Sequence, residues 1–174
     1  MLRATSVISF VALLLTAVGG CSESSHATST EAAASIDKSQ FLLVEEPSDA
    51  IGVMIAREDA KDKDEIVLLA RIGGRRNPFI EGRSAFMVID ASMTIVDDGQ
   101  ESGKGQVCLD DCCTTLRKES TMLVKVVGAD GKIVPLDARQ LLDVNENDLV
   151  VVKGKVERGK DSFSVAATGV YVRR

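Results

Sequence analysis

Cysteine is the residue type whose spacing in this chain could support chemistry. Three of the four cysteines, Cys108, Cys112 and Cys113, lie in one short stretch. In an oxidising compartment a disulfide would join Cys108 to Cys112 or Cys113 and leave one thiol free. A bond between the adjacent Cys112 and Cys113 would be strained and more easily reduced. A structural disulfide is therefore our first expectation for this stretch.

Two alternatives remain open for the same cysteines. Three thiolates could hold a soft ion such as Cu(I) or Zn(II), with Asp110 or Asp111 adding an oxygen ligand to zinc. The spacing lacks a Cys-x-x-Cys pair and so matches no standard zinc motif. The third interpretation is a redox-active or intermolecular thiol. No other cofactor is expected.

Histidine argues against an enzyme. The single histidine, His26, lies in a Ser-, Thr- and Ala-rich stretch, so a catalytic triad or a histidine general base inside the domain is excluded. No nucleophile elbow or phosphate-binding glycine loop is recognisable. Asp90, Asp97 and Asp98 could pair as a general acid and base. Carboxylates at a strand end or in a loop are, however, typically capping groups or solvated. We therefore expect a non-catalytic protein.

The N-terminus has the features of a secretory signal. Arg3 precedes an apolar run over residues 7–18, and small residues lead into Cys21. The run is too short for a comfortable transmembrane helix, which needs about 20 residues. Val18-Gly19-Gly20-Cys21 resembles a bacterial lipobox, which implies that the Cys21 thiol carries a lipid (palmitate-type acyl chains) and becomes the mature N-terminus. The motif departs from the usual pattern, which begins with Leu and continues with Ala or Ser, so an ordinary signal peptide is the alternative.

The stretch after Cys21 is typical of a tether. Residues 22–39 are rich in Ser, Thr, Ala and Glu and hold few large apolar side chains, a composition that favours a flexible spacer. Ser22, rather than Asp, follows the cysteine, which by resemblance to Gram-negative sorting favours the periplasmic side of the outer membrane. We expect a signal peptide at 1–20, a lipidated cysteine and tether at 21–46, and one domain at 47–174.

The remaining chain predicts a strand-rich domain. It has enough residues for one domain, and 45% of the whole sequence is apolar. Ser48 is expected to cap a helix whose apolar stripe is Ile51, Met54 and Ile55, closed by the charged stretch 58–64. Runs rich in Val, Ile and Leu predict strands at 65–72, 84–90, 121–127, 148–157 and 162–173. Residues 129–132 predict a turn, residues 158–161 a hairpin, and residues 137–142 a short helix.

Five strands with a helix between the third and fourth are the order of an OB-fold, a small Greek-key barrel. Residues 149–156 resemble the fourth strand of bacterial OB-fold proteins, in which a glycine (here Gly154) lets the strand bend. Gly73 and Gly74 fit the same role after the first strand, and Phe86 to Asp90 resembles a second strand that ends in an acidic residue. The resemblance covers about residues 65–173 and includes exported bacterial members. Another small β-barrel or sandwich is the alternative. Residues 92–119 are expected to form a cysteine-bearing loop insertion.

Charge distribution suggests a binding face. The chain has a net charge of −5, but residues 48–113 hold 8 basic and 13 acidic residues and residues 114–174 hold 11 and 8. In an OB-fold the loop after the first strand and the loop between strands four and five flank the common binding face. The basic residues expected there are Arg71, Arg75, Arg76, Arg83, Lys153, Lys155, Arg158 and Lys160.

Such a cluster would bind an anionic ligand such as an oligonucleotide, an acidic glycan or a lipid headgroup. Phe79 could stack on a base or a sugar if it were exposed, or else plug the barrel mouth; Phe86 and Phe163 are expected to face the core. With only 3% aromatic residues, we do not expect nucleic acid as the ligand, although the fold permits it.

Three functions follow. The first is an envelope lipoprotein, anchored in the membrane, whose non-catalytic OB-fold binds an anionic ligand or a protein partner. The second is a metal-binding or thiol-redox protein that uses the cysteine loop. The third is a structural envelope protein that binds its neighbours through the barrel. The first is preferred.

Overall fold

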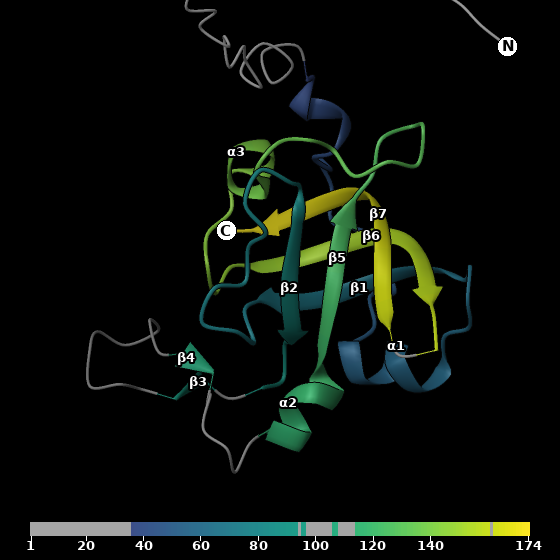
Figure 1. Cartoon of the computed structure of the whole chain (residues 1–174), viewed down its shortest axis with the longest axis vertical. Helices are drawn as coiled ribbons and strands as arrows, with labels where there is room; N and C mark the ends of the chain where they lie inside the picture. Colours follow the sequence, from purple (N-terminus) through teal and green to yellow (C-terminus); the bar gives the residue numbers. More distant parts are fainter. Residues whose placement is uncertain (1–35, 94, 97–105, 108–113, 161) are drawn as a thin grey trace, which may run out of the picture.

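The computed structural model describes residues 36–93, 95–96, 106–107, 114–160 and 162–174 of the chain (Figure 1). Its elements, in chain order, are η2 (Lys38–Gln40), α1 (Val53–Asp59), β1 (Glu65–Ile72), β2 (Ala85–Asp90), β3 (Ile95–Val96), β4 (Gln106–Val107), α2 (Thr114–Ser120), β5 (Thr121–Val126), α3 (Ala138–Leu142), β6 (Leu149–Arg158) and β7 (Phe163–Arg173).

Five of the strands form a closed barrel in the order β1-β2-β5-β7-β6. The β5–β7 pair is parallel and the other four pairs are antiparallel. This is the topology of an OB-fold-like barrel, so the predicted fold class is confirmed. The five predicted strands agree with the observed ones to within one residue at each end, because β-branched runs bounded by Gly, Asn and Asp mark them clearly.

Alternating residues of the strands fill the barrel. Phe86 and Val88 of β2 and Met122 and Val124 of β5 are buried in one core cluster, together with Val152 of β6. The residues between them, such as Met87 and Leu123, face outward and lie opposite each other. The alternation follows from the two-residue period of a strand.

Gly154 allows β6 to follow the curve of the barrel. The register with β7 shifts between Lys153 and Gly154. A Cβ atom at Gly154 would lie 2.4 Å from the backbone oxygen of Ala166 on β7. The OB-fold resemblance predicted a bend at this glycine, and the structure shows a register shift with a close backbone approach there.

Helices close the two ends of the barrel. The predicted helix before β6 is observed as α3, whose Leu141 and Leu142 are buried in the core and whose N-terminus is capped by the Asp137 side chain. At the other end α1 buries Val53 and Ala56. The predicted turn after β5 is also observed, with Gly131 at a positive φ of 75°.

The start of α1 was predicted wrongly. The helix begins at Val53 rather than next to Ser48, and its side chains Met54 and Ile55 are 38% and 52% exposed instead of forming the buried stripe. The cap comes from a distant residue: Asp90, at the end of β2, accepts a hydrogen bond from the Met54 amide at 3.0 Å. Gly52 leaves room for it, since a Cβ atom there would lie 2.6 Å from Asp90 Oδ2.

The packed part of the chain begins before residue 47, where we expected the domain to start. Phe41 is buried in the core, and Leu42 forms a parallel bridge with Val170 of β7. Arg173 of β7 also forms an ion pair with Glu46. Phe41 is thus a buried aromatic side chain within residues 21–46, which we expected to form the tether. Among the helices of the described residues, none is long and apolar enough to cross a membrane.

The expected loop insertion at 92–119 contains regular structure. Strands β3 and β4 form an antiparallel pair, and α2 leads directly into β5. Residues 114–120 include Leu, Arg, Lys and Glu and contain neither Gly nor Pro, which favours a helix. Cys108, Cys112 and Cys113 lie outside the described residues, as do Cys21, residues 1–35, Asp97 and Asp98.

Asp90 is buried, and its environment is suited to a charged carboxylate. Burial raises its pKa, but hydrogen bonds from Ser92 and from the backbone amides of Met54 and Val53 outweigh burial and hold the pKa below its ordinary value. The Ser92 hydroxyl donates to Asp90 Oδ1 at 2.6 Å. Asp90 is thus a capping residue that ties α1 to β2, and not a candidate acid or base.

Replacing Asp90 with Asn should lower the free energy of unfolding by about 1 kcal/mol at pH 7, because the charged cap is lost. A lowered pKa in the folded state stabilises the fold above the unfolded-state pKa of about 3.9, and this contribution is lost as the pH falls through the folded-state pKa. The difference between the two proteins in urea denaturation should therefore shrink from pH 7 to pH 2. Asp59→Asn, at an exposed position, is the control. A difference that does not change with pH would contradict this role of Asp90.

Candidate anionic-ligand site

The loop after β1 projects two arginines onto the outer face of the barrel. The amide of Gly73 donates to the Met87 carbonyl at 3.1 Å, and the amide of Met87 donates to the Pro78 carbonyl at 2.8 Å. The chain therefore stays bonded to β2 on both sides of an excursion at residues 74–77. Arg75 and Arg76 are exposed on this excursion.

Gly74 brings the excursion close to β5. Its φ is +82°, and a Cβ atom at this position would lie 2.6 Å from Cγ2 of Thr121, the first residue of β5. The same atom would be 3.4 Å from Cβ of Ile89, which is completely buried. The loop thus covers the outer β2–β5 face where β5 begins. Glycine is required at position 74 because its φ is in the left-handed region and a side chain there would collide with Thr121.

Helix α2 completes a basic hollow beside this loop. The hollow has a volume of about 420 Å³. We call it the basic hollow; its lining residues are Gly74, Arg75, Arg76, Met87, Thr114, Arg117, Lys118 and Thr121. Of these eight described residues, four are cationic and none is acidic. Sequence analysis missed Arg117 and Lys118, because it assigned residues 92–119 to a single loop.

The positive charges of the basic hollow are only partly compensated. Arg117 donates to Thr114 Oγ1 at 3.5 Å and has a further interaction. Within the part of the chain that the structure describes, the side chains of Arg75, Arg76 and Lys118 form no hydrogen bond or ion pair. Three exposed cations without partners around a concavity are suited to an anion, since guanidinium forks bind carboxylate or phosphate in pairs of hydrogen bonds.

The other predicted basic residues do not join this hollow. Arg71 donates to the Asn147 carbonyl at 2.8 Å, and Arg83 is exposed just before β2, outside the lining. Lys153 and Lys155 line a separate hollow of about 510 Å³ with Ile51 and Val67, and Lys155 forms an ion pair with Glu65 at 3.4 Å. In the β1–β6 register Arg71 lies opposite Leu149 and Glu65 lies opposite Lys155. Six strand residues, or roughly 20 Å, therefore separate Arg71 from Lys155.

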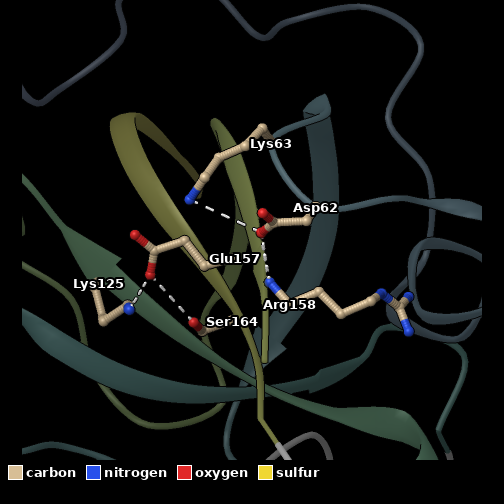
Figure 2. Close-up of polar contacts among 6 residues, drawn as sticks. All are labelled: Asp62, Lys63, Lys125, Glu157, Arg158 and Ser164. Carbon is tan, nitrogen blue, oxygen red and sulfur yellow. Dashed lines mark hydrogen bonds and ion pairs between the residues drawn. The ribbon is translucent and has the colours of Figure 1, made fainter. Parts of the chain in front are cut away.

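Arg158 is used for structure. Its guanidinium donates to the carbonyls of Arg57 at 2.6 Å and Ala60 at 2.9 Å, and so satisfies the C-terminal end of α1. Its backbone amide donates to Asp62, as Figure 2 shows. The Arg158 and Arg57 guanidinium groups lie 4.4 and 5.0 Å from the centre of the Phe163 ring. The Arg158 side chain, which we expected at the binding face, is thus engaged by α1, and the nearby Lys160 is exposed.

Arg57 links α1 to β5. It donates to the Thr121 carbonyl, and its Nε atom is buried without a partner among the described residues. Burial and the nearby positive charge of Arg158 lower the pKa of the Arg57 guanidinium, and Glu119 opposes them. Arg57 and Arg158 thus connect α1 both to Thr121 at the start of β5 and to the end of β6.

One further cation on the outer face of β5 is neutralised. Lys125 forms an ion pair with Glu157 of β6, reaching across β7, and Ser164 of β7 donates to the same carboxylate oxygen at 3.5 Å (Figure 2). Lys63 lies 3.8 Å from Asp62 in the same region. Among the described residues at β2 and β5, the exposed cations without a side-chain hydrogen bond or ion pair are thus Arg83 and, in the basic hollow, Arg75, Arg76 and Lys118.

Aromatic side chains stay away from the basic hollow. Phe79 is only 8% exposed, and its ring centre lies 6.3 Å from that of Phe86 in the core. The Arg139 guanidinium covers it from outside at 5.1 Å. Phe79 therefore closes the barrel mouth, the alternative that the sequence analysis left open, and it is not placed to stack on a ligand.

The described residues contain no group of three or more His, Cys, Asp or Glu side chains that could hold a metal ion. The proposed cysteine site for Cu(I) or zinc lies outside them. Comparison of the chain with models of protein families, with curated proteins and with solved structures finds no match.

Proposed function

We propose that this protein is an exported, lipid-anchored OB-fold-like module that binds an anionic ligand at the basic hollow and catalyses no reaction. One observation carries the binding proposal: Arg75, Arg76 and Lys118 surround a concavity without a carboxylate partner in the described part of the chain. The hollow also lies on the second and third barrel strands, a face that OB-folds use for ligands. The lipid anchor rests on the sequence around Cys21.

The arrangement favours binding of an anion at the basic hollow rather than attraction of anions to the whole protein surface. The chain as a whole is negative, so a polyanion would be repelled from most of its surface. Elsewhere on the barrel, cations such as Lys125, Lys155 and Arg173 are paired with carboxylates. Binding at the hollow should therefore depend on a few residues, and it should weaken as salt screens them.

Reversing three charges tests the binding proposal. In Arg75→Glu/Arg76→Glu/Lys118→Glu, affinity for heparin, used as a polyanionic probe, should fall at least roughly tenfold at about 0.1 M salt, and the salt dependence of binding should become shallower. The measurement is calorimetric titration at several salt concentrations.

The matched control is Lys63→Glu/Lys132→Glu/Lys160→Glu, which makes the same change in net charge at exposed positions outside the hollow. It should retain most of the affinity, and thermal melting of both variants should show intact folds. Equal losses in the two variants would mean that the chain responds to net charge alone, which would refute the proposed site.

Replacing Cys21 with Ala tests the anchor. The original chain should lose residues 1–20 and gain the mass of its acyl chains, whereas Cys21→Ala should gain no acyl mass, measured by intact mass spectrometry. An original chain that is cleaved but carries no acyl mass would argue against lipidation.

A further inference from the structure

The chain enters the barrel at the end opposite the basic hollow. Ile36 and Asp37 lie beside residues 128–135, which follow β5, whereas α2 and the hollow adjoin Thr121, where β5 begins. Figure 1 shows the same separation, with η2 above the barrel and α2 below it. Gly128 follows Thr121 by seven positions, which at the rise of an extended chain is roughly 23 Å. In a domain tethered at its N-terminus, the hollow thus lies on the side away from the point of entry.

The lining of the basic hollow is suited to a ligand that carries both acidic groups and hydroxyl groups. Arg75, Arg76 and Lys118 offer donors to acidic groups, and Thr114 and Thr121 are half-buried residues that add hydroxyls to the lining. Met87 supplies a half-exposed apolar patch between them. A volume of about 420 Å³ lies within the ordinary range of small-ligand sites.

The described lining of the basic hollow offers no support for recognition of nucleic-acid bases. OB-folds gain roughly 1–3 kcal/mol per base from stacking on aromatic side chains. The aromatic side chains of the described residues are elsewhere: Phe41, Phe79 and Phe86 are buried, Phe163 lies beneath two arginines, and Tyr171 is a half-buried residue of β7 opposite Val151. None lines the hollow. A nucleic acid would therefore be held by its phosphates alone.

We infer that the basic hollow binds an acidic polysaccharide, with the carboxylates of its sugar units on the arginines, at the end of the barrel opposite to the point where the chain enters it. This inference rests on the proposed function, because it assumes the anionic site. It adds the ligand class, and it makes the headgroups of the membrane an outcome of the test.

The test compares three anionic probes on the full chain with Cys21→Ala. These are polygalacturonate, single-stranded oligothymidylate and vesicles of phosphatidylcholine that contain about 30% phosphatidylglycerol, an anionic lipid. We expect salt-sensitive binding of polygalacturonate, at least roughly tenfold weaker binding of oligothymidylate because stacking is absent, and no vesicle binding. Arg75→Ala/Arg76→Ala should abolish the polygalacturonate signal, and Lys63→Ala/Lys132→Ala should preserve it.

Other outcomes overturn the inference in distinguishable ways. Binding of oligothymidylate as tight as that of polygalacturonate would identify phosphate chains, and vesicle binding lost in Arg75→Ala/Arg76→Ala would identify lipid headgroups; both leave the proposed anionic site intact. Failure of all three probes, together with failure of heparin, would refute the proposed function itself. As a further check, the lipidated chain in phosphatidylglycerol vesicles should bind polygalacturonate as well as it does in neutral vesicles.

Discussion

The divided pairing of β1 determines the rest of the structure. β1 pairs with β6 along seven residues, from Glu65 to Arg71, but with β2 only through Ala70, Arg71 and Ile72. The first half of β1 therefore has a free edge, which the Ile51 bridge to Leu68 covers before the chain enters α1. Beyond Ile72 the chain keeps its bonds to β2 only by looping outward at residues 74–77. The basic hollow is a consequence of this loop, since the loop sets Arg75 and Arg76 against α2.

Two residues distant in sequence then anchor α1 at the end of the barrel where the basic hollow lies. Asp90 binds the first turn of α1, and Arg158 binds its last carbonyls. Arg57, on the same helix, reaches the backbone of Thr121, which also lines the basic hollow. Charged groups at this end are thus divided between two tasks. Arg57, Asp90 and Arg158 hold α1 in place, whereas Arg75, Arg76 and Lys118 remain accessible to a ligand.

The sequence predicted the strands well and the site only in part. Apolar runs bounded by turn residues are local signals, so the five barrel strands, α3 and the bend at Gly154 could all be predicted. The cap of α1 could not, because its partner Asp90 lies 36 residues away from Met54. The same limit explains the basic face. Charge alone could not distinguish Arg158, whose donors are occupied by α1, from Arg75, and no local signal placed Lys118 beside the first loop.

The central claim is that an anion binds between the first loop and α2, and mapping the contact by NMR tests it most directly. Backbone amide shifts of the Cys21→Ala chain would be followed during titration with polygalacturonate. The account predicts the largest shifts at Gly74, Arg75, Arg76, Lys118 and Thr121, with little change at the β6–β7 hairpin. Shifts centred instead on Lys153, Lys155 and Thr168, which line the separate hollow over β1 and β6, would contradict it.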